Sequence, residues 1–298
     1  MSTVAVAPAP AIATAAARPV VRRSRGWWQL LLRNRMAMTG AAVIVVWVVI
    51  ALLAPLIAPY DPIDQNVRSR LQGPSAAHWF GVDGLGRDVF SRVLWGGRVS
   101  LPVAAIVVLV ATAFGTLYGG LAAFSGKWSD EGAMRLVDMV LAFPSLILAM
   151  AIAAALGPSI QNSMLAMPLV WWPPYARLAR GQVLSLKNRE FVVAARALGM
   201  SELRVLLRHV LPNSVAQALV LMTMDFGNAI IITAALSFLG LGAVPPTPEW
   251  GAMVAEGREL ITQWWISTFP GIAIFLVALA CNFLGDGLRD AIDPRLRV

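Results

Sequence analysis

Charged residues are scarce in this chain. They make up 13% of its 298 residues, whereas hydrophobic residues make up 58%. Soluble domains carry about 25% charged residues, so the composition excludes an ordinary soluble protein and indicates an integral membrane protein. Cysteine is nearly absent as well. Because Cys281 has no second cysteine to pair with, an internal disulfide is excluded.

Familiar patterns of catalysis are also missing. The chain has no G-x-x-x-x-G-K-[ST] phosphate-binding loop and no G-x-S-x-G nucleophile elbow. It has no cluster of His and Cys that would predict a metal site. We therefore expect a non-catalytic protein with no catalytic residue, no metal and no cofactor.

Long uncharged stretches are what the sequence does contain. A membrane-spanning helix needs about 20 apolar residues, so four stretches hold one helix each, and the longest holds two, divided at Gly157-Pro158. A β-barrel would need strict alternation, which these stretches lack. The sequence thus predicts an all-α integral membrane protein with six transmembrane helices. The stretches are 36–60, 99–126, 139–176, 226–248 and 260–285.

Prolines and glycines refine these helices. Val89–Ser100 predicts a separate short amphipathic helix before the second span, and Pro144 and Pro173-Pro174 predict kinks or breaks. Gly115-x-x-x-Gly119 is a pattern typical of closely packed membrane helices. The expected spans are about 37–58, 99–123, 135–156, 162–180, 213–242 and 266–285.

Three regions follow from this division. Residues 1–26 lack periodicity and predict a disordered tail; residues 27–98 predict an interfacial segment, the first transmembrane helix and a long loop; residues 99–298 predict a five-helix core. In the loop at about 243–265, a helix-like stretch runs to Trp265. Trp264 and Trp265 are expected at the membrane interface.

The basic residues indicate an orientation. Net charge is +8, and three quarters of the 24 Lys and Arg residues lie in the tails and alternate loops that a six-span topology places in the cytoplasm. The positive-inside rule then predicts that both termini are cytoplasmic. His78 and His209 fall on opposite sides of the membrane, so they cannot share a metal. Because the charge is scattered between spans, nucleic-acid binding is not expected. The outside residues are Arg68, Arg70, Arg87, Arg92, Arg98 and Arg258.

One loop, about 181–212, carries a compact pattern of small and breaking residues. The pair Ala194-Ala195 is followed by Gly199 and later by Leu211-Pro212. Two short helices separated by a glycine would make a knuckle, and small alanines would let a partner surface approach. Gly199 can adopt backbone angles forbidden to other residues, and Pro212 is expected to limit the second helix.

Two pairs of polar residues lie in or near spans. Asp225 and Asn228 share one helix face in the fifth span, and an intramembrane carboxylate usually faces the bundle interior. We expect Asp225 either to line a translocation pathway or cap a gate, or to be a structural hydrogen-bond partner or lie near the cytoplasmic interface. Arg135 and Asp138, three residues apart at the start of the third span, predict an ion pair within the helix in preference to a role on the pathway.

The ordered motifs resemble one family. The chain is similar to the C-type permease subunits of dipeptide/oligopeptide/nickel ABC importers from about residue 27 to its end. The 194–199 motif lacks the Glu that often precedes its alanines, since Val193 stands there, and His209 replaces an aliphatic residue. The matching motifs are GVDGLGRDVFSR (81–92), MRLVD (134–138), AARALG (194–199), RHVLPN (208–213), LSFLGLG (236–242) and GDGLRDAIDP (285–294).

This resemblance implies a role. The subunit would lie in the cell membrane, paired with a homologous B-type permease. Two cytoplasmic ABC ATPases would hydrolyse the ATP, and an extracytoplasmic substrate-binding protein would also be a partner. Residues 181–212 would be the coupling loop between spans four and five, with Ala194, Ala195, Gly199, Leu211 and Pro212 contacting or positioning the ATPase. A di- or oligopeptide is the expected substrate. The alternative is a self-contained secondary carrier or channel, whose inverted repeats we do not find.

Overall fold

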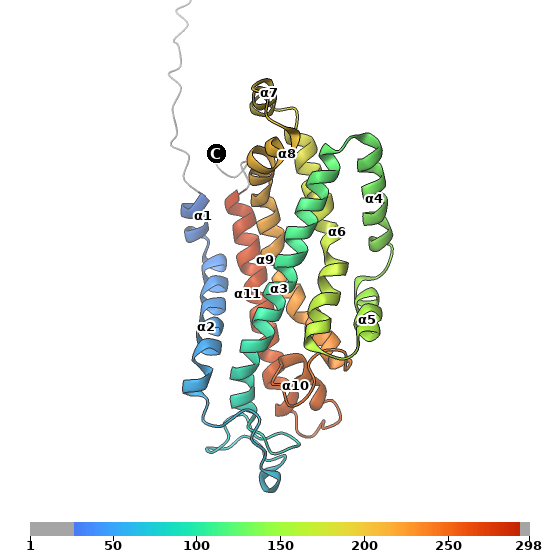
Figure 1. Cartoon of the computed structure of the whole chain (residues 1–298). Coiled ribbons are helices and arrows are strands. Elements are labelled where there is room, and N and C mark those ends of the chain that lie inside the picture. The colour runs from blue at the N-terminus through green and yellow to red at the C-terminus, as the bar shows by residue number, and fades with distance from the viewer. Residues whose placement is uncertain (1–26, 293–298) are drawn as a thin grey trace, which may run out of the picture.

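The computed structural model describes residues 27–292, and within them the chain is helical apart from turns and one isolated bridge between Val82 and Asp88. The predicted tail, 1–26, and the last six residues lie outside this range. The long helices run side by side along one axis, with α7 at one end and α10 at the other (Figure 1). These helices are α2 (Arg35–Ile57), α3 (Val89–Phe124), α6 (Ile160–Leu186), α9 (Leu211–Phe238) and α11 (Trp265–Ile292).

Shorter helices complete the fold. The segment α1 (Trp27–Arg33) precedes α2, and a 3-10 turn, Val67–Ser69, lies in the loop that follows α2. Two helices, α4 (Lys127–Leu141) and α5 (Ser145–Leu156), stand beside α6. The knuckle region contains α7 (Glu190–Ala197) and α8 (Glu202–Val205), and α10 (Trp250–Glu256) precedes α11.

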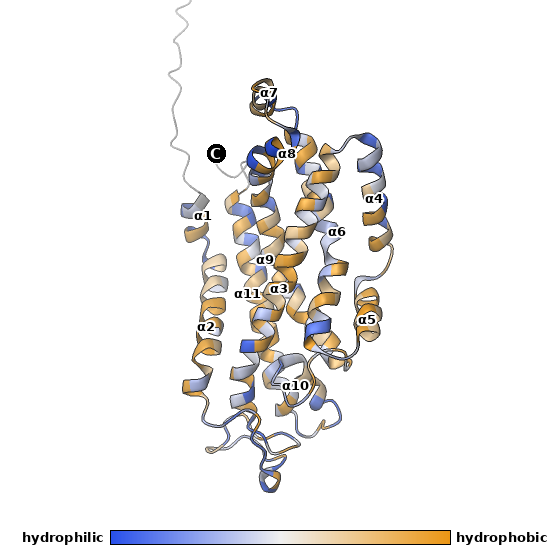
Figure 2. Cartoon of the chain, in the orientation of Figure 1, coloured by the Kyte–Doolittle hydropathy of each residue, from blue (hydrophilic) through white to orange (hydrophobic). Residues whose placement is uncertain are grey.

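Four helices in the described residues are long and apolar enough to cross a membrane, or five if the bent pair α4–α5 counts as one span. The four are α2, α3, the continuous helix Glu202–Phe238 and α11. Although α6 has 27 residues, it is too polar to join them. Figure 2 shows this difference in hydropathy: α2 and α5 are strongly apolar, whereas α6, which packs against its neighbours, is paler and therefore more polar.

Pro144 breaks the chain as expected. It separates α4 from α5, whose axes differ by 86°. By contrast, Pro173 and Pro174 lie inside α6, which continues through them without a break. A kink there stays a prediction. The expected short helix Val89–Ser100 was wrong as a separate element, because it forms the first turns of α3, whose amino end Asp88 caps by accepting the Ser91 N–H at 2.7 Å.

Close packing of α3 against α6 confirms the glycine pattern. A Cβ on Gly115 would lie 2.3 Å from the Trp172 carbonyl oxygen, and one on Gly119 would lie 2.0 Å from that of Ala176. Both contacts are with backbone, which cannot move aside. The two helices therefore approach as closely as glycine allows.

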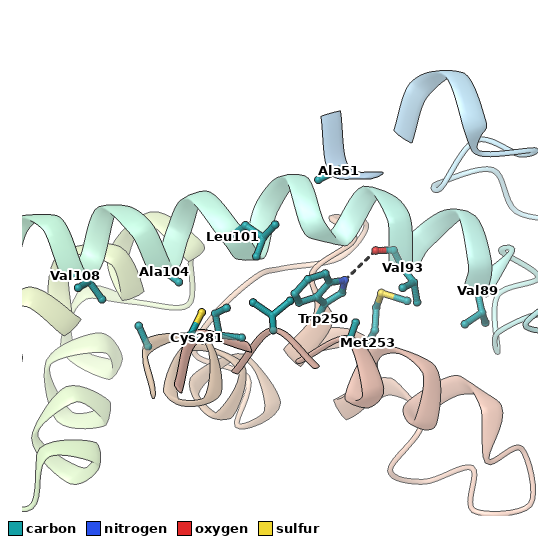
Figure 3. Close-up of a cluster of buried hydrophobic side chains, with 13 residues drawn as sticks. Ala51, Val89, Val93, Leu101, Ala104, Val108, Trp250, Met253 and Cys281 are labelled. Carbon is teal, nitrogen blue, oxygen red and sulfur yellow. Dashed lines mark hydrogen bonds between the residues drawn. The ribbon is translucent and has the colours of Figure 1, made fainter. Parts of the chain in front are cut away.

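The largest buried cluster lies where α10 meets α3 and α11. Trp250 is fully buried there, and its indole Nε1 donates to the Val93 carbonyl at 2.9 Å. Gly96 and Gly97 leave the space on α3 that the ring occupies. Figure 3 shows the indole directed from α10 toward α3, with Met253 and Cys281 nearby. This contact fixes α10 across the end of the bundle.

The loop after α9 differs from expectation. Its helix ends at Glu256 instead of continuing to Trp265. Trp265 is partly buried, because its indole Nε1 donates to the Val82 carbonyl at 3.2 Å and its ring covers Gly81. Trp264 is 55% exposed, so of the two it is the one free to meet an interface, and that position stays a prediction.

Candidate functional site

The knuckle formed by α7 and α8 projects beyond the long helices (Figure 1). Gly199 ends α7 with a positive φ of 80°. Its N–H donates to the Arg196 carbonyl at 2.9 Å, and the Met200 N–H donates to the Ala195 carbonyl at 3.2 Å. This pair of bonds is a Schellman motif, in which glycine is the favoured residue. The structure therefore contains the first predicted short helix, α7, followed by Gly199, but the second is the start of a long continuous helix, Glu202–Phe238.

The two alanines of the motif face different ways. Ala195 is buried with Val192 and Val205 in a small core beneath α7, whereas Ala194 is exposed. Large apolar side chains are exposed beside Ala194: Phe191 at 41%, Val193 at 53% and Leu198 at 84%. Both alanines were expected to present a small, accessible surface to a partner, but of the two only Ala194 does so.

Leu211 and Pro212 lie where the knuckle joins α9. Pro212 does not limit the second helix, contrary to expectation, because α8, a π-helical segment (Leu206–Val210) and α9 run on as one helix. Proline cannot donate to a carbonyl four residues back, and the π turn just before it, closed by the Leu211 N–H on the Leu206 carbonyl, accommodates that loss. The Leu211 side chain packs against Gly120 of α3.

Arg196 holds the knuckle together, a role that sequence reasoning missed. Its guanidinium donates to both carboxylate oxygens of Glu202 at 2.9 Å and to the Lys187 carbonyl at 3.1 Å. It also lies over the Phe124 ring, 5.6 Å from the centroid. One side chain thus connects α7, α8 and the ends of α6 and α3. The only sequence signal was an Arg and a Glu six residues apart in one basic loop.

Asp225 and Asn228 lie together, as their spacing predicted. The Asn228 amide is 3.5 Å from one Asp225 carboxylate oxygen, and the Tyr175 hydroxyl donates to the other at 2.8 Å. Both residues line a cavity of about 430 Å³ between α5, α6 and α9, together with Ser145, Trp171, Pro174, Leu221, Ile231 and Ile232. The carboxylate therefore has a structural hydrogen bond and also borders open space.

A second cavity continues along α9 toward the knuckle. It measures about 530 Å³ and shares Leu221 with the first. Its polar lining comes from Gln217 on α9 and Arg289 on α11. Gln217, Leu221, Asp225 and Asn228 are three or four residues apart, so they form one stripe of the helix. Open space thus follows this α9 stripe over several turns.

The predicted ion pair between Arg135 and Asp138 does not form. Asp138 accepts instead from Arg177 of α6 at 2.6 Å, and both side chains are about half exposed. The interaction joins α4 to α6 in place of stabilising α4 alone. Helix spacing makes a local pair possible, but it does not exclude a better-placed partner on a neighbouring helix.

At the α10 end, the 81–92 motif builds a buried ionic cluster that sequence reasoning did not foresee. Asp83 accepts from Arg87 Nε at 2.7 Å and also from Arg92. Both guanidinium groups also donate to Glu256 at the end of α10, Arg87 at 2.8 Å and Arg92 at 2.7 Å. Asp83, Arg87 and Arg92 are at most 2% exposed. The cluster ties the loop and α3 to α10. His78 lies nearby, with Nδ1 2.9 Å from Asp88 Oδ1.

Comparison with known proteins decides the family. The model of the binding-protein-dependent transport system inner membrane component matches residues 115–298, and that of the N-terminal TM domain of oligopeptide transport permease C matches residues 23–74. The chain belongs to this permease family. The permease is thus an inner-membrane subunit of a binding-protein-dependent importer, and its family membership makes it a non-catalytic component.

Named relatives resemble the permease along most of its length. It is 47% identical over 268 residues to the dipeptide transport system permease protein DppC of Alkalihalophilus pseudofirmus, covering 90% of this chain and 88% of the relative. It is 47% identical over 273 residues to the glutathione transport system permease protein GsiD of Escherichia coli O1:K1, covering 91% and 90%.

A solved structure shares the fold. The permease resembles a chain of the inward-facing MetNI methionine ABC transporter with a TM-score of 0.55 and 14% identity. The match covers 68% of the permease and 98% of that chain.

Among the described residues of the permease, no three His, Cys, Asp or Glu side chains come together as a metal site would require.

Proposed function

We propose that this permease imports di- or oligopeptides as half of a translocation pathway, in a heterodimer with a homologous B-type permease. The named relatives, a dipeptide permease and a glutathione permease, both handle short peptides. Two cytoplasmic ABC ATPases would supply the energy, and an extracytoplasmic binding protein would deliver the substrate.

The knuckle is the proposed contact with an ATPase. It projects from the bundle, and exposed apolar residues surround the small Ala194 at its tip. Exposed apolar surface rimmed by polar residues commonly marks a protein interface. Gly199 shapes the turn, and Ala195, packed underneath, supports it. This projecting, internally braced element is the observation on which the proposal rests.

Movement of the knuckle would pass to the spans through rigid connections. The helix from Glu202 to Phe238 is continuous, so α8 and the pathway helix α9 form one element. Leu211 against Gly120 and Arg196 over Phe124 both join the knuckle to α3. Closure of an ATPase pair would therefore shift α9 and α3 together, as alternating access requires.

The α9 stripe is the proposed pathway surface. Asp225 and Asn228 present polar groups to a cavity from the middle of a mostly apolar helix. A carboxylate beside an amide could hold the amino group or backbone N–H groups of a peptide by charge-assisted hydrogen bonds. Tyr175 would orient the carboxylate from behind through its hydroxyl.

The proposed topology has six spans and cytoplasmic termini. In this arrangement α6 is a span despite its polarity, because other helices cover it, and α4 with α5 forms the broken third span. The α7 end then faces the cytoplasm. The excess of Lys and Arg in the segments at that end supports this orientation.

The substitution Ala194→Trp tests the coupling proposal. A large ring at the exposed tip should prevent close approach of the ATPase, so that both co-purification of the ATPases and ATP-driven peptide uptake fall at least about tenfold, the loss of roughly 1.4 kcal/mol of contact. Ala76→Trp, at an exposed alanine near the opposite end, is the matched control and should retain the ATPases.

Full ATPase recovery with Ala194→Trp would contradict the proposed docking surface. Uptake by reconstituted permease without ATPases or ATP would instead favour the self-contained carrier. ATPase recovery and uptake without ATP are measured independently. A self-contained carrier would transport peptide without ATP and would not be affected by Ala194→Trp.

A further inference from the structure

A basic cavity lies below the knuckle, where α3, α4, α6 and α7 meet. Its volume is about 410 Å³. Four cationic side chains and one carboxylate line it, together with three apolar residues, Gly126 and an amide. The charged lining residues are Lys127, Asp130, Arg180, Lys187 and Arg196, and the others are Ala123, Phe124, Gly126, Leu184 and Asn188.

The cations in this cavity exceed the acids that face them. Arg180 donates to both Asp130 oxygens at 2.6 and 2.7 Å, and Arg196 is paired with Glu202. Within residues 27–292, the ammonium groups of Lys127 and Lys187 form no ion pair. Two positive charges therefore remain available to an anion.

The start of α4 adds to this positive potential. Gly126 occupies the N-cap with a φ of 92°, and no side chain accepts from the first N–H groups of this 15-residue helix. Unpaired N–H groups at a helix start carry partial positive charge and favour anions. The helix start reinforces the cationic side chains and would not make a site without them.

Part of the cavity lining is apolar. Ala123, Phe124 and Leu184 contribute to it, and Trp128, next to Lys127 in the sequence, is 85% exposed. Exposed tryptophan is typical of the membrane–water interface. Basic pockets between spans at this depth suit anionic headgroups, and an apolar wall beside the charge suits the attached acyl chains.

We propose that this cavity binds the phosphate headgroup of an anionic phospholipid, with Lys127 and Lys187 as its main ligands. The lipid would bridge α4 to the end of α6, directly below the Arg196 contacts that brace the knuckle. Binding by the chain does not depend on the peptide substrate or on any partner subunit. It therefore stands or falls apart from the proposed transport function.

Native mass spectrometry of the full-length permease in detergent tests this proposal. Titration with dioleoylphosphatidylglycerol should show one retained lipid, whereas dioleoylphosphatidylcholine should show none. Lys127→Gln with Lys187→Gln should weaken phosphatidylglycerol binding about tenfold to thirtyfold, the effect of two basic residues at a membrane surface. Lys127→Arg with Lys187→Arg should retain it.

The matched control is Arg204→Gln with Arg208→Gln. These exposed residues lie in the same basic region, outside the cavity, and their removal changes the net charge equally. Equal losses in the control and the lysine variant would overturn the proposal in favour of general electrostatic attraction. Unchanged binding in the lysine variant would overturn it directly.

Two further outcomes address other occupants. Displacement of the lipid by inorganic phosphate at equal concentration would overturn the proposal in favour of a soluble-anion site. Loss of lipid binding when the permease is purified with its ATPases would assign the cavity to an acidic side chain of the ATPase. Retention of the lipid in both experiments is the expected result.

Discussion

Asp225 and Asp83 are both hydrogen-bonded carboxylates, but their surroundings differ. Asp225 has one tyrosine and one amide as partners and borders a cavity. Asp83 contacts two buried guanidinium groups, which are themselves bound by Glu256. The first arrangement leaves a carboxylate available to a ligand. The second consumes its acceptor capacity, so it can only stabilise structure.

Replacing Asp225 should separate transport from assembly. Asp225→Asn keeps the shape and the Tyr175 contact but removes the charge. We therefore expect uptake to fall about tenfold, because one charge-assisted hydrogen bond to the substrate is lost, while complex formation is retained. The measurement is peptide uptake alongside purification of the complex. Asp138→Asn, at a half-exposed surface ion pair, is the control. Wild-type uptake with both Asp225→Asn and Asp225→Ala would exclude a pathway role.

Replacing Asp83 should instead destabilise the α10 end. Asp83→Asn leaves Arg87 and Arg92 buried with one acidic partner, and removing one member of a buried charge group costs about 3 to 5 kcal/mol. Thermal unfolding in detergent and hydrogen exchange at residues 81–92 would measure this loss. Glu259→Gln, at an 82% exposed side chain, should have little effect. Equal stability of the two variants would show that the cluster is not a brace.

Among the helices, α3 is the element on which the others are arranged. Its glycines admit α6, its amino end packs on Trp250 of α10, and Gly120 near its carboxyl end receives Leu211. At Gly115 and Gly119 the close approach leaves little freedom to slide, since any side-chain atom there would meet the backbone of α6. The pair α3–α6 should therefore move as one body when the knuckle moves.

The glycine contact between α3 and α6 can be tested directly. Gly119→Ala places a methyl group against the Ala176 backbone, and we expect destabilisation of about 1 to 3 kcal/mol by overpacking. The readout is the midpoint of thermal unfolding in detergent. Gly181→Ala on α6, where an added Cβ meets no atom within 4 Å, should be neutral. A neutral Gly119→Ala would mean that the helices are less closely packed than described.

For the molecule as a whole, the proposed transport role needs polar surfaces in three places: at the two ends, which would meet other proteins, and along the α9 stripe, which would meet the substrate. Figure 2 shows apolar residues concentrated in the middle of the bundle and hydrophilic ones near α7–α8 and in the opposite loops. The α9 stripe is where open space reaches into that apolar middle. A single subunit leaves this surface uncovered, which is why we propose a second permease facing it.

Cysteine labelling tests the orientation. In a Cys281→Ala background, Leu198→Cys and Ile261→Cys place single thiols at positions of nearly equal exposure, 84% and 85%, at opposite ends of the molecule. A membrane-impermeant maleimide should label Ile261→Cys in spheroplasts and Leu198→Cys only after the membrane is opened. The reverse pattern would place the knuckle outside the cell and exclude its proposed contact with the ATPases.

Local chemistry accounts for what could be read from the chain. Charge scarcity and apolar stretches indicated a helical membrane protein, Pro144 marked a break, and the Gly199 and Gly115/Gly119 patterns marked a turn and a close contact. Each of these depends on one segment or on a backbone preference. The motifs identified the family for the same reason, since they are contiguous.

Contacts between distant segments could not be read in this way. Asp138 pairs with Arg177 and not with Arg135. Both Arg87 and Arg92 donate to Glu256. A π turn accommodates Pro212 within a continuous helix. The energy of a charge or a proline depends on which groups surround it after folding. Those surroundings arise only when α3, α6, α9 and α10 pack together, so the cavities and the buried cluster belong to the folded molecule.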